Sequence, residues 1–242
     1  MSGAEYASYD VCETVALLDW IQAGYVRPLE DLPGFDEVKE RCVSGSVDYF
    51  TFPGPDGKTH TWAIPFYTSC QLFYYRTDLL EKAGYSKPPR TYDELLEYSK
   101  ALTKGGVYGY VIDWADDNFV YRFAERMLAA GGGQLVDENS KPQWNSKAGI
   151  RALSWMRDMW QAKVVVPESI NIESSGVSMN IFLQGTAAFT QNWTIVSAAM
   201  NDPNKSAIVG KAKESINLGD VLESASVASY GGLFIPKKSE KR

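Results

Sequence analysis

Apolar runs of the kind that form buried strands alternate with amphipathic helical patterns along most of this chain, and glycine or proline separates them. The patterns predict strands at 61–66, 107–113, 186–190 and 233–236. They predict helices at 13–22, 91–102, 119–130 and 146–162. Strands that alternate with helices indicate an α/β fold.

Local patterns add three more specific predictions. Thr91 and Glu94 have the spacing of a capping box, which predicts a helix start at that point. The small polar run 68–70 predicts a corner between two aromatic strands. The helix at 146–162 is expected to turn one set of residues toward the core. This set is Ile150, Leu153, Met156 and Trp160.

Composition excludes several classes of protein. The chain has 242 residues, 45% of them hydrophobic, which is typical of a globular protein with a substantial core. Its formal charge of −6 gives no basic surface for nucleic acid, so nucleic acid is not an expected partner. Cys12, Cys42 and Cys70 have neither metal-site nor disulfide-framework spacing, which leaves one pair plus one free thiol open.

Patterns typical of catalysis are weak in this sequence. His60 is the only histidine and lies between two threonines beside a turn, so we interpret it as a strand residue. Asp116 and Asp117 are adjacent, which directs their side chains apart, whereas glycosidic catalysis needs facing carboxylates. The glycines at 131–133 follow a helix instead of preceding one, so they do not predict phosphate binding. No metal or cofactor is expected.

Aromatic residues stand next to small polar groups at several predicted strand ends. An aromatic ring offers an apolar face and an amide or carboxylate offers directed hydrogen bonds, a combination that suits sugars and other polar small molecules. The alternative is that these aromatics pack in the core. The clusters are Phe66-Tyr67-Thr68, Asp117-Asn118-Phe119, Asn192-Trp193-Thr194 and Tyr230-Gly231-Gly232.

Several motifs resemble those of family 1 of the extracellular solute-binding proteins of ABC importers, the maltose-binding-like group. The most specific match runs from Ile64-Pro65-Phe66-Tyr67 to Tyr92-Asp93-Glu94-Leu95. Weaker matches follow in the same order at 130–135, 182–189 and 231–237, and an early one lies at 9–29. Together these matches cover nearly the whole chain.

The resemblance implies a two-lobe periplasmic-binding-protein-like fold of type II, with ligand held in an interlobe cleft. It implies a partial N-lobe at 1–68, a C-lobe at 69–226 and a return strand at 227–242. Since the family begins with an exported leader and ends with further helices, the chain is expected to be truncated at both ends. Its export signal would then lie outside this sequence, and the protein would act outside the cytoplasm, in the periplasm or anchored at the cell surface.

By the same resemblance, the protein is a monomeric, non-enzymatic binding protein that delivers a carbohydrate to ABC permease subunits. Two alternatives remain open, a sensor or scaffold with the same fold and a carbohydrate-active enzyme. The site residues carried over from the family are Trp193, Tyr67, Thr68, Glu13, Asp117, Asn118, Phe119, Tyr230 and Gly231.

Overall fold

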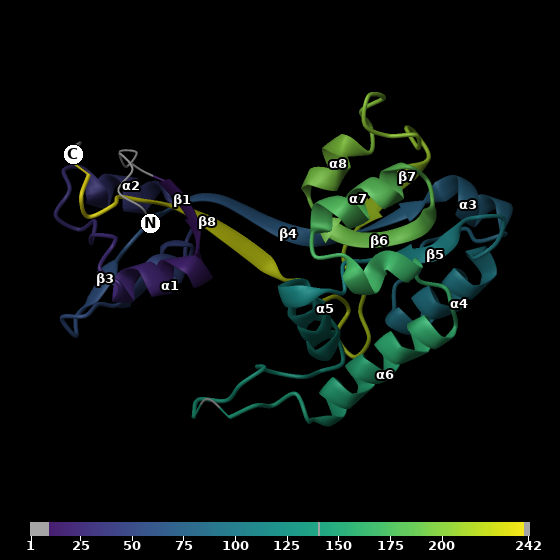
Figure 1. Cartoon of the computed structure of the whole chain (residues 1–242), viewed down its shortest axis with the longest axis horizontal. Helices are drawn as coiled ribbons and strands as arrows, with labels where there is room; N and C mark the ends of the chain where they lie inside the picture. Colours follow the sequence, from purple (N-terminus) through teal and green to yellow (C-terminus); the bar gives the residue numbers. More distant parts are fainter. Residues whose placement is uncertain (1–9, 140, 240–242) are drawn as a thin grey trace. The chain divides into compact units, whose positions relative to one another are not determined.

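A computed structural model describes residues 10–139 and 141–239 of the chain, except for the side chains at 10–15, 116 and 117. The chain divides into two compact units. Unit 1 combines residues 1–69 with 228–242, and unit 2 is the continuous stretch 70–227. Unit 2 is therefore inserted between the two segments of unit 1 (Figure 1).

Unit 1 contains short helices and two small groups of strands. Its elements are β1 (Asp10–Glu13), α1 (Thr14–Gln22), α2 (Phe35–Arg41), β2 (Thr51–Pro53), β3 (Thr59–Thr61), the first part of β4 (Ile64–Arg76) and β8 (Ala228–Phe234), with a 3-10 turn at Val47–Phe50. β1 pairs antiparallel with β8, and β2 with β3. The core gathers Leu17, Phe50 and Trp62 with Phe234 from the last strand. Helix α2 was not predicted from the sequence.

Unit 2 is built on a four-stranded sheet. Its strands lie in the order β7 (Ala212–Ser215), β4, β6 (Ala187–Trp193) and β5 (Tyr108–Val111). β5 and β6 are parallel, whereas β4 is antiparallel to both of its neighbours. The helices are α3 (Thr77–Lys82), α4 (Tyr92–Leu102), α5 (Asp116–Ala129), α6 (Lys147–Gln161), α7 (Ser175–Leu183) and α8 (Ile195–Ala199), with a 3-10 turn at Pro167–Asn171.

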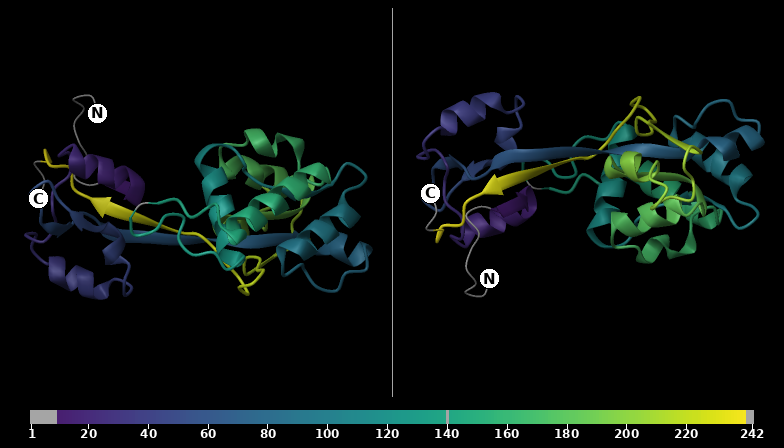
Figure 2. Two further views of the ribbon diagram at one scale, coloured as in Figure 1. Left: turned by 90° about the horizontal axis from the view of Figure 1, so that it is seen from below. Right: turned by 90° about the horizontal axis from the view of Figure 1, so that it is seen from above.

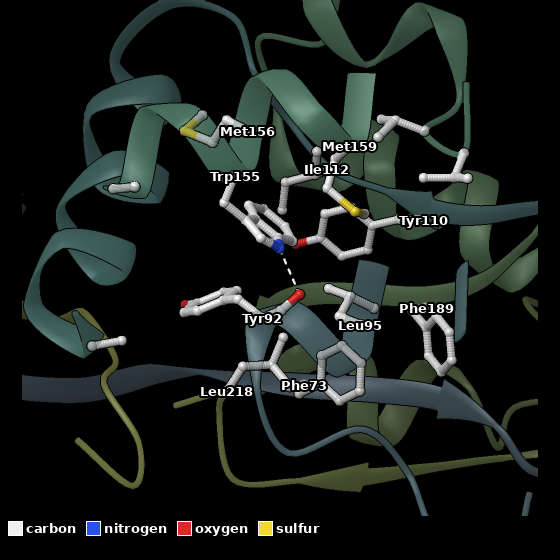
Figure 3. Packing of buried hydrophobic residues seen from close by; sticks show 14 of the residues in the cluster. Phe73, Tyr92, Leu95, Tyr110, Ile112, Trp155, Met156, Met159, Phe189 and Leu218 are labelled. Carbon is white, nitrogen blue, oxygen red and sulfur yellow. Dashed lines mark hydrogen bonds between the residues drawn. The ribbon is translucent and has the colours of Figure 1, made fainter. Parts of the chain in front are cut away.

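Helices cover both faces of this sheet because side chains alternate along its strands. Tyr110 faces α4, α5 and α6 in one buried cluster, and Val111 faces α7 and α8 in the other. Figure 3 shows the first cluster, in which the indole nitrogen of Trp155 donates to the carbonyl of Tyr92. The α/β fold predicted from the alternating patterns is confirmed.

The capping box predicted at the start of α4 is also confirmed. The Thr91 hydroxyl accepts a hydrogen bond from the amide of Glu94 at 3.1 Å, and the Glu94 carboxylate accepts one from the amide of Thr91 at 3.3 Å. The helix then ends at Leu102, as its pattern of apolar residues predicted.

The predicted polar corner at 68–70 is wrong. β4 is one strand of 13 residues from Ile64 to Arg76, drawn as a single ribbon in Figure 2. Thr68 and Cys70 are exposed on it and Ser69 is partly exposed. A strand needs only backbone pairing, so small polar residues with access to solvent do not have to interrupt it. β6 likewise continues through Trp193, three residues beyond the predicted strand end at 190.

The predicted core face of α6 is also wrong. Ile150, Leu153 and Trp160 are 56%, 46% and 39% exposed, and among the four expected residues only Met156 is buried. The helix buries the neighbouring face instead, with Ala148, Ala152, Trp155, Met156 and Met159. Small alanines on that face let the helix approach the core closely. The prediction considered only large apolar residues and therefore selected the wrong face.

A polar cluster is fully buried in unit 2. The Asp113 carboxylate accepts from Arg122 Nη2 at 2.6 Å and Nε at 3.0 Å, and both side chains are inaccessible to solvent. Glu125 accepts from the Asn217 amide at 3.0 Å and from the backbone amide of Val227 at 3.3 Å. Burial raises the pKa of Glu125, although Arg122 opposes this shift. These contacts connect the segment that follows β5, helix α5 and the last residue of unit 2.

Candidate functional site

Trp193 ends strand β6 and is held on both sides of its peptide unit. Its backbone amide donates to Asn192 Oδ1 at 2.8 Å, and its carbonyl accepts from the Tyr74 hydroxyl at 3.1 Å. Burial raises the pKa of Tyr74 to about 12, so this hydroxyl stays protonated and remains a donor. The indole is partly exposed on a rigid backbone, which is what a stacking platform requires.

Asn118 and Phe119 lie in the first turn of α5, which begins at Asp116, three residues before the predicted helix start at 119. Asn118 Nδ2 donates to the carbonyl of Glu173 at 2.7 Å. The amide nitrogen of Asn118 is therefore engaged in a hydrogen bond within the protein. Phe119 is 39% exposed and lines an apolar groove of about 410 Å³ together with residues of α5, α6 and the loop between them. Asp117 begins the same helix, and its side chain lies outside the described part.

The segment 173–175 makes hydrogen bonds near both groups of predicted site residues in unit 2, the one at 117–119 and the one at Trp193. Asn118 holds the carbonyl of Glu173, and Asn192 Nδ2 donates to the carbonyl of Ser175 at 2.9 Å. The segment that contains Glu173 is therefore bonded to the start of α5 at Glu173 and, two residues later, to Asn192 beside Trp193. We name the surface formed by Asn118, Glu173 and Trp193 the unit 2 surface.

Glu173 was not predicted as a site residue. The hydrogen bond that places it joins residues 55 positions apart in the chain, so no local pattern reveals it. Its side chain is exposed, and Ser174 next to it caps α7 by accepting from the amide of Gly176 at 3.2 Å.

In unit 1, Tyr67 and Gly231 are in direct contact. A β-carbon built at Gly231 would come within 2.0 Å of the Tyr67 ring, so the ring lies on bare backbone. Gly231 also pairs with Glu13 across β1 and β8, although the Glu13 side chain lies outside the described residues. The structure therefore brings three of the predicted positions together, and Thr68 follows Tyr67 as an exposed residue on β4.

Tyr230 stacks on a residue that was not predicted. Its ring lies parallel to that of Tyr49, with 4.0 Å between the ring centroids and 21° between the planes. The nearby Tyr230 side chain raises the pKa of Tyr49, so the Tyr49 phenol is neutral at physiological pH. Tyr49 is 48% exposed. Tyr49 precedes Phe50, which is fully buried, and adjacent residues point in different directions. The sequence around Tyr49 gives no other indication that it faces outward. Tyr49, Tyr67, Tyr230 and Gly231 form what we name the unit 1 surface.

His60 lies on β3 with its two ring nitrogens near carboxylates. Nε2 is 3.0 Å from Asp56 Oδ2 and Nδ1 is 3.6 Å from Glu30 Oε2. Hydrogen bonding to Asp56 raises the pKa of His60, and the same bond lowers the pKa of Asp56. This arrangement is an ion pair at a turn.

The described residues show no group of three or more histidine, cysteine or carboxylate side chains placed to bind a metal ion. Cys42 and Cys70 are free thiols, and Cys12 lies outside the described side chains. Over 10–139 and 141–239, no helix combines the length and apolar character needed to span a membrane.

Comparison with known families and proteins gives consistent matches. The family model described as bacterial extracellular solute-binding protein matches residues 8–242. A probable ABC transporter-binding protein of Deinococcus radiodurans is 29% identical over 156 residues, covering 62% of this chain and 36% of that protein. The mannitol-binding protein of Pseudomonas aeruginosa is 21% identical over 231 residues, covering 92% of this chain and 50% of that protein.

Solved structures agree with these matches. The maltose-bound MalE3 of T. maritima superposes with a TM-score of 0.84 at 28% identity, covering 99% of this chain and 59% of that one. A ribitol-bound solute-binding protein from Agrobacterium radiobacter K84 has the same fold, with a TM-score of 0.80, 22% identity and coverage of 96% and 58%. The chain spans between about a third and a half of the curated relatives described above, and somewhat over half of the solved chains.

Proposed function

Since this chain belongs to the bacterial extracellular solute-binding protein family, we propose that it is the solute-binding component of an ABC importer and that its solute is a carbohydrate or a polyol. The protein would bind this solute outside the cytoplasm as a monomer and deliver it to the transmembrane permease subunits. It would catalyse no reaction on the solute.

The observation that carries this proposal is the partly exposed indole of Trp193 at the rigid end of β6. Its backbone is fixed by Asn192 and Tyr74, so the ring is ordered before any ligand arrives. Sugars and polyols present apolar C–H faces and hydroxyl groups together, which matches a ring beside amide and carboxylate groups. MalE3 and the mannitol-binding relative, whose names specify such ligands, support the same class.

The unit 1 surface supports the proposal independently. Tyr49 and Tyr67 are 48% and 41% exposed although both are large aromatics, and Gly231 leaves the backbone open beneath Tyr67. We propose that the unit 1 surface and the unit 2 surface both take part in binding, together with the predicted residues Thr68, Glu13, Asp117 and Phe119.

An enzymatic role is disfavoured by the placement of the acidic pair. Asp116 and Asp117 are adjacent in the sequence, which is not the spacing of a facing carboxylate pair. Retaining and inverting glycosidases both need two carboxyl groups that face one another across the substrate. A sensor that uses the same binding surface remains the alternative, and it would dock to a receptor in place of a permease.

Isothermal titration of the purified protein with maltose, mannitol and ribitol tests the proposal directly. We expect saturable binding of at least one of these solutes, with no product detected by chromatography after prolonged incubation. Conversion of the solute would contradict the non-enzymatic role. Failure to bind any saccharide or polyol in a wider panel would refute the proposed solute class.

A further inference from the structure

We infer that the solute is electrically neutral and that Glu173 is a specificity-determining residue that rejects anionic analogues. This inference rests on the proposed function, because it concerns the solute of the same surface. It separates two kinds of solute that relatives of this chain bind according to their names, neutral polyols and sn-glycerol 3-phosphate.

The first step is the fixed position of Glu173. Asn118 holds its carbonyl at 2.7 Å, and Asn192 holds the carbonyl of Ser175 two residues later at 2.9 Å. Ile172 on the other side is 4% exposed, and its carbonyl accepts from the amide of Ala115. Three of the four carbonyls from Ile172 to Ser175 are held in this way, so Glu173 projects from a fixed backbone, which a residue that selects ligands requires.

The second step is the charge of Glu173. Its side chain is exposed, and no ion pair joins it to a cation within the described part of the chain. It precedes Ser174, the N-cap of α7, so its carboxylate lies near the start of that helix. An ionised carboxylate accepts hydrogen bonds and donates none, so it is matched to hydroxyl groups and mismatched to phosphate oxygens.

The third step is the absence of cationic residues from the sequence of every site segment. Lysine, arginine and histidine are absent from the sequence of the segments 10–14, 47–50, 64–70, 113–121, 172–180, 191–201 and 227–233. The only charged residues in these segments are acidic. Phosphate recognition in proteins relies on arginine or lysine, or on uncompensated helix N-termini. These segments supply no such cation for a phosphate.

Helix N-termini could in principle attract an anion here, because α5 and α7 both begin at this surface. Each of these helix starts already carries acidic residues of the chain. Asp116 and Asp117 are the first two residues of α5, and Glu173 directly precedes the N-cap of α7. Since the exposed side chain of Glu173 directly precedes the N-cap of α7, an anion bound at that helix start would meet like charge.

Matched pairs of ligands test the inference by calorimetry at about 0.15 M salt, where distant charges are screened. The probes are maltose with maltose 1-phosphate, and mannitol with mannitol 1-phosphate. We expect one neutral member to bind. The dissociation constant of its phosphorylated partner should be higher by about a hundredfold or more, because like charges placed together in a binding site strongly disfavour association.

Two variants isolate the role of Glu173. Glu173→Gln should weaken binding of the neutral ligand about tenfold, through loss of one charged hydrogen bond, and should reduce the discrimination against the phosphorylated partner. Glu168→Gln is the matched control, because Glu168 is exposed on the preceding turn of the same loop and should change neither affinity.

Each outcome has a distinct meaning. A phosphorylated member that binds as well as its neutral partner overturns the inference and leaves the proposed function intact. A Glu173→Gln variant that behaves like Glu168→Gln overturns the role of Glu173. If neither member of either pair binds, nor any neutral solute of a wider panel, the proposed function fails and the inference fails with it.

Discussion

The ring of Tyr67 rests directly on Gly231, where a β-carbon would come within 2.0 Å of the ring. The adjacent Gly232 is equally restricted, but by different neighbours. Its β-carbon would meet the ring of Phe50 at 2.7 Å and the side chain of Ala63 at 2.9 Å, and both of these residues are fully buried. One glycine thus faces an exposed ring and the next faces the core.

We predict that Gly231→Ala reduces solute affinity with little loss of stability. The Tyr67 ring is 41% exposed and can rotate away from the added methyl group, but this displacement removes it from the unit 1 surface. Calorimetry would measure the affinity and thermal melting the stability. Affinity equal to that of the unmodified protein would contradict the assignment of Tyr67.

The neighbouring change Gly232→Ala should have the opposite effect. Phe50 is enclosed on all sides, so the added methyl group overpacks the core and should lower the free energy of unfolding by about 1–3 kcal/mol. Urea unfolding would measure this loss. Solute affinity at a temperature where the variant is folded should change less than in Gly231→Ala.

Trp193→Ala should lose most of the solute affinity and retain its fold. The residue contributes one stacked ring, worth about 1–3 kcal/mol of binding free energy. Trp160→Ala provides a control in the same unit, since Trp160 is 39% exposed on α6 and lies outside the unit 2 surface. Equal affinities of the two variants would exclude Trp193 from the site.

The buried pair of Asp113 and Arg122 gives a prediction about stability. Arg122→Met leaves the Asp113 carboxylate buried without its partner and should lower the free energy of unfolding by about 3–5 kcal/mol. Arg157→Met removes an exposed ion pair with Asp158 and should cost less than about 1 kcal/mol. Denaturant titration of both variants would show whether the difference exists.

The pair of His60 and Asp56 should make the stability of unit 1 depend on pH. Because hydrogen bonding to Asp56 raises the pKa of folded His60, its contribution is complete below about pH 6.5, the unfolded value, and is lost as the pH rises through the folded value. Asp56→Asn should therefore destabilise the protein more at about pH 5.5 than at about pH 9. Melting curves at both pH values would test this.

A control for that experiment is Asp31→Asn. Asp31 pairs with Arg27, which stays charged across this range, so its effect should be the same at both pH values. An Asp56→Asn effect that is equally independent of pH would show that His60 does not titrate against Asp56.

Patterns within a few residues of one another were sufficient to predict the α/β fold and the cap at Thr91. They were misleading where both faces of an element carry apolar residues. Helix α6 has Ile150 and Leu153 on one face and Trp155 and Met159 on the other, and burial selects the face that also has small alanines. That choice depends on the packed neighbours and not on hydrophobicity alone.

The candidate site shows the same limit. Trp193 and Tyr67 were predicted as site residues because an aromatic ring beside polar residues is visible in the sequence. Glu173 and Tyr49 were missed because distant residues define their surroundings. Glu173 is placed by Asn118 and Tyr49 by Tyr230, and neither contact leaves a local pattern.

The insertion of unit 2 within unit 1 also sets an order for folding during synthesis. All of 70–227 leaves the ribosome before Ala228, so unit 2 has its complete sheet and helices available while unit 1 still lacks β8. Phe234 belongs to the unit 1 core, and β1 has β8 as its paired strand. The nascent chain can therefore complete unit 2 first, while the part of unit 1 that precedes it waits for β8.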